Sequence, residues 1–157
     1  MAASHPLSID RSGRLLGVRQ LRSPNQDRRP RGQQAELIVV HGISLPPGRF
    51  GGPAIEQLFT NRLPAARRPF LAELRGLRVS AHVLVRRTGE IIQFVAFHRR
   101  AWHAGESRFN GRERCNDFSV GVELEGTDDR PYEPAQYRAL AAVIAALRET
   151  YPGLWRA

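Results

Sequence analysis

Two residues of this chain combine a chemically useful side chain with a position that favours access to it. The first, His41, ends the apolar run that begins at Leu37 and stands just before Gly42. An imidazole at the end of a buried strand can bind a metal, move a proton or make a structural hydrogen bond. The residues around His41 do not choose among these roles.

The second residue, Glu123, lies in a segment that alternates apolar and polar residues from Phe118 to Glu125. On a strand, this alternation sends Glu123 to the same face as Ser119 and Gly121. These small neighbours leave space in front of the carboxylate, which could then accept a proton from a bound water. The alternatives are a solvent-facing charge on an edge strand, or a catalytic role for Glu125 instead.

Metal binding by this chain would have to rest on histidine and carboxylate side chains. Cys115 is the only cysteine, which excludes an internal disulfide and a thiolate cluster. A catalytic zinc site needs three protein ligands and an open position for water. None of the five histidines has the spacing of a local metal motif: His5, His41, His82, His98 and His103.

The net charge of +9 results from 24 basic residues against 15 acidic ones, and every basic residue is an arginine. A basic protein suggests nucleic-acid binding, but these arginines are scattered, and no zinc finger or aromatic-rich RNA motif accompanies them. Arginine also suits ligands with carboxylates, because its planar fork binds them through two hydrogen bonds. We therefore expect no nucleic-acid partner.

The sequence contains no apolar stretch long enough to cross a bilayer. Met1–Asp10 lacks the charged start and apolar middle of a secretory signal. We expect a cytoplasmic protein without a membrane partner.

The pattern of apolar residues predicts the strands that position these side chains. Leu37–His41 and Phe118–Glu125 are typical of buried strands. Val79–Val85 and Glu90–Val95 predict a β-hairpin with Gly89 in its turn, and His82 falls within the first of its strands.

Two helices are predicted as well. The first spans Pro53–Thr60, with proline at its start, where a missing N–H has no cost. The second runs from near Pro134 to a stop before Pro152. Its predicted apolar stripe consists of Tyr137, Leu140, Ala141, Ile144 and Leu147.

The order of these elements, β, α, β-hairpin, β, α, indicates an α/β fold: a single domain with a central mixed β-sheet flanked by helices. Residues 10–34 are rich in Arg, Pro, Gln and Gly and show little periodicity. We therefore expect residues 1–34 to form an irregular segment that packs on the domain, and residues 35–157 to form the domain itself.

Five separated motifs, read in order, resemble the zinc-dependent 1,6-anhydro-N-acetylmuramoyl-L-alanine amidases of the AmpD type. This family shares its fold with peptidoglycan-recognition proteins and phage-type amidases. The motifs are Val39–Gly48, Arg78–His82, Ala101–Gly105, Gly111–Ser119 and Gly121–Gly126.

The resemblance implies a cytoplasmic enzyme that cuts the amide between the lactyl group of anhydromuramic acid and L-Ala during recycling of cell-wall fragments. It implies Zn²⁺ as the cofactor, His41 as the first zinc ligand and Glu123 as the catalytic carboxylate. In phage relatives a tyrosine precedes the histidine matched by His82. Ala81 stands there in this chain, as expected where Glu123 takes the catalytic role.

The resemblance also implies how the substrate is held. Arg78 and Arg114 match arginines that hold the carboxylates of the peptide, and Trp102 would line the sugar end. The implied partner is a small muropeptide, bound by a monomer. The alternative for each arginine is a purely structural role or a solvent-exposed side chain without a function.

Two departures from the family pattern affect the site. Gly42 stands where the family usually has asparagine, so a hydrogen bond near the site would be lost. After its last helix the family continues into a segment with a second zinc histidine, an aspartate ligand and a catalytic lysine. This chain has no histidine after His103 and no lysine. We therefore expect residues 35–157 to be a truncated amidase domain without that segment, with His82 and His103 as the remaining candidates for replacement ligands.

The incomplete ligand set keeps several hypotheses open. The first is an amidase of (anhydro)muropeptides whose activity suffers from the missing ligands. The second is a non-catalytic peptidoglycan-fragment-binding protein, which would retain Arg78, Trp102 and Arg114. A basic nucleic-acid binder is the third hypothesis, and a shortened remnant without a stable fold is the fourth.

Overall fold

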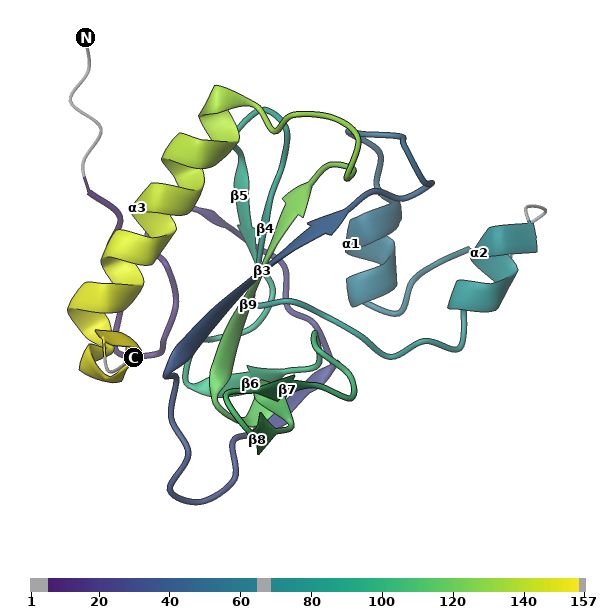
Figure 1. Cartoon of the computed structure of the whole chain (residues 1–157). Helices are drawn as coiled ribbons and strands as arrows, with labels where there is room; N and C mark the ends of the chain where they lie inside the picture. The colour runs from purple at the N-terminus through teal and green to yellow at the C-terminus, as the bar shows by residue number, and fades with distance from the viewer. Residues whose placement is uncertain (1–5, 65–68, 156–157) are drawn as a thin grey trace, which may run out of the picture.

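A computed structural model describes residues 6–64 and 69–155, so His5 and Arg156–Ala157 lie outside the described residues. Five strands form one mixed sheet at the centre of the molecule (Figure 1). This arrangement confirms the predicted α/β class. In sheet order the strands are β1 (Arg19–Gln20), β5 (Ile91–Gln93), β4 (Val83–Val85), β9 (Ser119–Glu125) and β3 (Leu37–Ile43).

Strand β9 pairs in parallel with the edge strand β3 on one side and with β4 on the other. All seven of its residues are buried. Its apolar side chains therefore lie on one covered face of the sheet, and its polar side chains lie on the opposite face, which is covered as well. β4 and β5 form the predicted antiparallel hairpin, with Gly89 at φ +86°. β4 begins at Val83, so His82 precedes this strand and does not lie within it as predicted.

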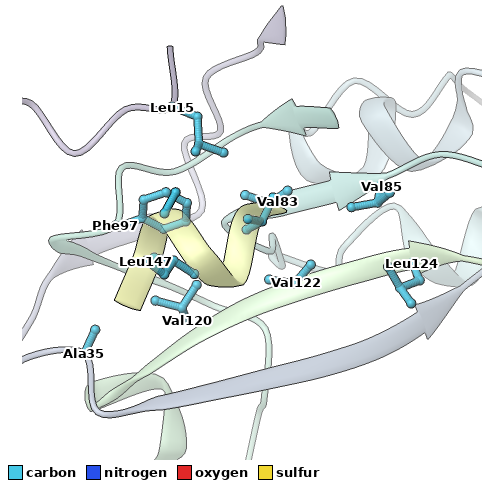
Figure 2. Packing of buried hydrophobic residues seen from close by; sticks show 11 residues of the cluster. Leu15, Ala35, Val83, Val85, Phe97, Val120, Val122, Leu124 and Leu147 are labelled. Atoms are coloured by element: carbon cyan, nitrogen blue, oxygen red, sulfur yellow. The ribbon is translucent and has the colours of Figure 1, made fainter. Parts of the chain in front are cut away.

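Helix α3 (Pro134–Thr150) covers one face of the sheet (Figure 1). Pro134 occupies the first turn, and Glu133 and Gln136 form a capping box around it. Figure 2 shows Leu147 of this helix beside Val120 in the first core cluster. That cluster consists of Leu15, Ala35, Val83, Val85, Phe97, Val120, Val122, Leu124, Val143, Ala146 and Leu147.

The buried face of α3 differs from the predicted stripe. Tyr137 is 56% exposed, whereas Gln136 is completely buried. The Gln136 amide donates hydrogen bonds to the carbonyls of Val85 and Glu125, at the ends of β4 and β9. A polar side chain whose partners are strand ends cannot be recognised from apolar periodicity. Leu147 is the residue of the predicted stripe that is fully buried.

The other face of the sheet packs against α1 (Ala54–Phe59), which agrees with the predicted helix. A second helix, α2 (Pro69–Leu74), lies further from the sheet and was not predicted (Figure 1). The second core cluster consists of Leu45, Ile55, Leu58, Phe59, Ala81, Leu84, Ile92, Phe94, Val95 and Ala101.

Short elements gather at the end of the sheet where β9 begins (Figure 1). They are β2 (Gln26–Arg28), paired with β6 (Arg99–Ala101), then β7 (Arg108–Phe109), paired with β8 (Arg112–Glu113), and the 3-10 helix η1 (Cys115–Asp117). A further 3-10 helix, η2 (Pro152–Trp155), follows α3.

The segment before β3 is held by buried polar contacts. The guanidinium of Arg29 donates hydrogen bonds to four backbone carbonyls, those of Phe97, Asn116, Asp117 and Ser119. Burial lowers the pKa of Arg29 to about 10. Arg29 therefore fixes the N-terminal segment beside the start of β9.

Candidate active site

His41 and Glu123 are directly paired across the parallel strands β3 and β9. Paired residues of neighbouring strands project to the same face of a sheet and lie next to each other. This face is opposite to α3, because Val120, Val122 and Leu124 occupy the α3 side. The structure thus brings together the two residues that the sequence singled out for chemistry.

Glu123 is only 8% exposed, and its Oε2 atom has no hydrogen-bond partner among the described residues. Burial without a compensating partner disfavours the charged form. It raises the pKa of Glu123 from 4.5 to about 7. Such a carboxyl group can gain or lose a proton near neutral pH, as a general base must.

Glu125 shares this face of β9, but its carboxylate is engaged elsewhere. It accepts hydrogen bonds from the Arg86 guanidinium at 2.8 Å, from the Gly51 N–H at 2.7 Å and from the Arg87 N–H at 3.2 Å. Arg86 also donates to Glu56 of α1 at 2.6 Å. This network fixes the end of β9, and it leaves Glu123 as the better candidate for a base.

His41 contacts a second histidine, His103, which follows Trp102 in a loop. The His41 Nε2 and His103 Nδ1 atoms are 2.9 Å apart, and the His103 Nε2 atom is 3.0 Å from the Ser119 hydroxyl oxygen. Burial lowers the pKa of His41. Burial, with smaller effects of His41 and Arg29, lowers the pKa of His103 to about 3. Both rings are therefore neutral at pH 7.

The ring of His103 fills the space in front of Gly121, which the sequence suggested would be open. A Cβ atom at Gly121 would lie closer than 3.0 Å to three atoms of this ring. The small residue at position 121 therefore admits an imidazole instead of providing free volume before Glu123.

His82 is completely buried, and both of its ring nitrogens have partners. Nδ1 accepts the Gly121 N–H at 3.0 Å, and Nε2 lies 3.0 Å from the Arg99 carbonyl oxygen. Burial lowers the pKa of His82 well below its usual value. These contacts make His82 a structural histidine and a poor replacement ligand.

The three residues predicted to bind substrate lie on different loops. Arg78 is exposed and precedes Ser80, whose N–H donates to the Trp102 carbonyl at 3.0 Å. Trp102 itself is half-buried beside His103. Arg114 is 71% exposed, with its Nε atom 3.4 Å from the Asp117 carboxylate. Trp102 is the neighbour of His103 in the chain, and both arginines are exposed, with the Arg78 guanidinium 3.4 Å from the Arg75 carbonyl oxygen.

Within residues 6–64 and 69–155, no group of three or more His, Cys, Asp or Glu side chains could hold a metal ion. His41 nevertheless suits a single ligand position. Its Nε2 atom faces His103, while its Nδ1 atom makes no hydrogen bond to any described residue. The described residues supply part of a catalytic zinc site and not all three ligands.

Sequence reasoning missed the contact of His103 with Ser119 and the pocket beside His41. The loop that carries His103 is held by Asn116 of η1, whose side-chain oxygen accepts the N–H groups of His103 and Ala104. A pocket of ≈ 400 Å³ is lined by Leu37, Val39, His41, His103, Ala104, Ser107, Arg108, Phe109 and Cys115.

The model of the N-acetylmuramoyl-L-alanine amidase family matches residues 31–156, and this chain belongs to that family. The resemblance indicated by the five motifs is thereby confirmed.

Within the family, the chain is similar to the 1,6-anhydro-N-acetylmuramyl-L-alanine amidase AmpD. It is 57% identical to the Escherichia coli enzyme over 142 residues, which are 90% of this chain and 78% of that protein. It is 55% identical to the Citrobacter freundii enzyme over 142 residues, 90% of this chain and 76% of the relative. A crystal structure of a selenomethionine derivative of AmpD matches with a TM-score of 0.89 and 54% identity, covering 93% of this chain and 81% of that one.

No helix within the part of the chain that the structure describes is both long and apolar enough to span a membrane.

Proposed function

We propose that this protein hydrolyses the amide bond between the lactyl group of 1,6-anhydro-N-acetylmuramic acid and L-Ala, with Zn²⁺ as cofactor. Membership of the amidase family supports the reaction class. The name shared by relatives that are 57% and 55% identical supports the anhydromuramyl substrate. The observation that carries the proposal is the direct pairing of His41 with Glu123 on one face of the sheet.

In this proposal Glu123 is the general base and then the general acid. Its raised pKa, about 7, leaves a substantial ionised fraction at neutral pH. The ionised carboxylate removes a proton from the water that attacks the lactyl carbonyl carbon. When the carbon–nitrogen bond breaks, the same group returns the proton to the amine of L-Ala. Proton transfer of this kind contributes roughly 10²- to 10⁴-fold in rate.

His41 is the residue of this chain that we propose to hold zinc, through the Nδ1 atom that no described residue engages. Bound zinc would polarise the scissile carbonyl and lower the pKa of a bound water towards ~7. The remaining ligands of such a site are not among the described residues. The contributions of this chain are therefore one imidazole ligand and the base.

Substrate recognition is proposed to use Arg78, Arg114 and Trp102. The two guanidinium groups are exposed and can pair with the carboxylates of the peptide stem. Trp102 lies next to His103 and offers an aromatic surface for the sugar.

A second candidate function is binding of peptidoglycan fragments without cleavage. The observation that favours it is the absence of a three-ligand metal group within the described ranges. The two functions differ in a simple way, because a binding protein would retain affinity for the muropeptide but release no peptide.

Mass spectrometry of the products tests the proposed function. Purified protein is incubated with Zn²⁺ and 1,6-anhydro-N-acetylmuramoyl-tripeptide. We expect 1,6-anhydro-N-acetylmuramic acid and free tripeptide as products, and no other cleavage. Glu123→Gln is the matched control, since it keeps the shape of the side chain and removes the base. Muropeptide binding without any cleavage by the wild-type protein would favour the fragment-binding alternative.

We place this activity in the cytoplasm. Cys115 is a free, buried thiol, which is compatible with a reducing compartment. Fractionation of cells that express a tagged chain would detect the protein with cytoplasmic markers, and recovery with periplasmic markers would contradict this location.

A further inference from the structure

Arg100 lies at the centre of a charged network that joins β2, β6 and η1. Its Nε and Nη2 atoms donate to the two carboxylate oxygens of Asp27 at 2.7 Å and 2.6 Å. Its Nη1 atom donates to the carboxylate of Asp117. Asp27 of β2 is directly paired with Arg100 of β6, and η1 ends at Asp117. The nitrogens of one planar guanidinium therefore hold two carboxylates in a fixed geometry.

Each of these carboxylates also contacts a residue that is proposed to bind substrate. The pKa of Asp27 is lowered by the hydrogen bonds from Arg100 first, and also by one from the Trp102 side chain. The Oδ2 atom of Asp117 lies 3.4 Å from the Arg114 Nε atom. The Arg100 network thus has five members in order: Trp102, Asp27, Arg100, Asp117 and Arg114.

The centre of the Arg100 network is mostly buried, and one of its ends is on the surface. The side chains of Arg100 and Asp117 are 19% and 15% exposed, whereas that of Arg114 is 71% exposed. Bidentate pairs between arginine and a carboxylate are the ion pairs that best keep a defined geometry. The exposed guanidinium of Arg114 is therefore held from a more rigid centre.

Arg100 determines which nitrogens of Arg114 stay available. Asp117 uses its Oδ1 atom for Arg100 and its Oδ2 atom for the Nε of Arg114. The two Nη atoms of Arg114 have no hydrogen-bond partner among the described residues, so they can bind a carboxylate of a ligand. Without Arg100, both oxygens of Asp117 would be available to Arg114. A bidentate pair with Asp117 would then engage the Arg114 guanidinium within the protein.

Arg100 acts on Trp102 through Asp27. An indole has a single N–H donor, so a hydrogen bond to a fixed acceptor sets the direction of the ring. The backbone of Trp102 is fixed separately, because its N–H donates to the Asn25 carbonyl at 3.3 Å and its carbonyl accepts the Ser80 N–H at 3.0 Å. Loss of Arg100 would therefore loosen the ring of Trp102 and leave its backbone in place.

We propose that Arg100 is a positioning residue for substrate binding, because it holds the two carboxylates that orient the Trp102 indole and the Arg114 guanidinium. This role rests on the proposed function, in which these two side chains contact the sugar and the stem peptide. Arg100 is not itself a proposed substrate contact, so its loss should raise KM and leave kcat almost unchanged. The orientation of Trp102 is a property of the ligand-free protein.

Hydrogen exchange of the Trp102 indole N–H, followed by NMR in the ligand-free protein, tests the orientation without any activity. The chain has two tryptophans, so Trp102→Phe assigns the signal. We expect exchange about tenfold faster in Arg100→Met, because the hydrogen bond to a fixed carboxylate is lost. Arg100→Lys keeps the charge without the planar fork. It should lie between the two, and it supplies the same comparison where Arg100→Met folds poorly. Wild-type exchange in both variants would overturn the proposal.

Steady-state kinetics with 1,6-anhydro-N-acetylmuramoyl-tripeptide tests the effect on substrate binding. Arg100→Met should raise KM about tenfold and change kcat by less than about twofold. In a protein that already carries Trp102→Ala and Arg114→Ala, Arg100→Met should have no further effect on KM, because the residues through which it acts are gone. An equal rise of KM in that background would contradict positioning.

Arg19→Met is the matched control for both measurements. The Arg19 guanidinium also contacts two carboxylates, those of Glu56 at 2.7 Å and Glu90 at 3.8 Å, and neither belongs to the Arg100 network. We expect wild-type indole exchange and wild-type KM in this variant. Equal effects of Arg19→Met and Arg100→Met would contradict a specific role of Arg100. Absence of muropeptide turnover in the wild type would instead contradict the proposed function, so the two failures are distinguishable.

Discussion

His41 and Glu123 face the same side of the sheet at directly paired positions of the parallel strands β3 and β9. Neither residue needs a long or flexible side chain to reach the other, because adjacent strands lie only about 5 Å apart. The base and the proposed zinc ligand are therefore held by backbone hydrogen bonds of the sheet.

The activity should depend on pH through Glu123. The base must be ionised to remove a proton, and burial raises its pKa to about 7. We therefore expect kcat/KM to rise about tenfold per pH unit below pH 7 and to level off above it. A profile that levels off near pH 4.5 instead would mean that the unperturbed carboxylate, or another group, acts as the base. Glu123→Gln should lower kcat by at least about 100-fold across this range.

The same carboxyl group should make folding stability pH-dependent. Because its pKa is about 7 in the folded state and near 4.5 in the unfolded state, the folded protein binds more protons between these values. The free energy of unfolding should therefore fall as pH rises from about 4.5 to 7, by about 3 kcal/mol from this group. Urea unfolding at pH 5 and pH 8 measures the difference. The Glu123→Gln variant should lack this part of the pH dependence of stability. The same pH dependence in the variant and the wild type would contradict the assignment to Glu123.

Arg86 should be important for stability, because it pairs with two carboxylates in the interior. Its side chain is 7% exposed, and that of Glu125 is 2% exposed. Removing Arg86 leaves Glu125 buried without its cation, so Arg86→Met should cost about 3–5 kcal/mol in denaturant unfolding. Arg108→Met is the matched control, since Arg108 and Glu113 are both 66% exposed, and its cost should stay below about 1 kcal/mol. Similar costs for the two variants would argue against this network.

Gly121 should be intolerant of a side chain because of His103. A methyl group there would overlap the imidazole, and overpacking of this kind costs about 1–3 kcal/mol. We expect Gly121→Ala to destabilise the protein, and the double variant with His103→Ala to cost less than the sum of the two single changes. Additive costs in this double-mutant cycle would show that the ring does not occupy the space above Gly121.

Arg114 combines exposure with an unusual backbone conformation. Its φ of +62° lies in the left-handed region, which costs a non-glycine residue about 1–2 kcal/mol. Arg114→Gly should therefore be more stable than Arg114→Ala by about 1 kcal/mol in urea unfolding. Both variants should raise KM for the muropeptide about tenfold, because each loses one charged hydrogen bond to the substrate. Arg138→Ala, on the exposed side of α3, should leave KM unchanged. An unchanged KM in both Arg114 variants would assign this arginine to structure.

The sequence was sufficient to predict the strands that carry His41 and Glu123, because both strands contain strong apolar patterns. It could not predict that these residues are paired, since the register of two parallel strands depends on the whole sheet. The contacts of His103 were also inaccessible, because the ring reaches β9 from a loop that Asn116 anchors. The α3 stripe was confirmed at Leu147 and wrong at Tyr137, which is exposed. The reason is that Gln136, a buried glutamine with strand-end partners, takes the place of an apolar residue.

Hydrolysis in water enriched in oxygen-18 tests the central claim most directly, namely that water adds to the lactyl carbonyl at the His41–Glu123 pair. Products from 1,6-anhydro-N-acetylmuramoyl-tripeptide are weighed by mass spectrometry after a single turnover. We expect one labelled oxygen in the carboxylate of the released anhydromuramic acid, none in the peptide, and no reaction in Glu123→Gln. Cleavage at the same rate in Glu123→Gln, or a label incorporated into the peptide, would contradict it.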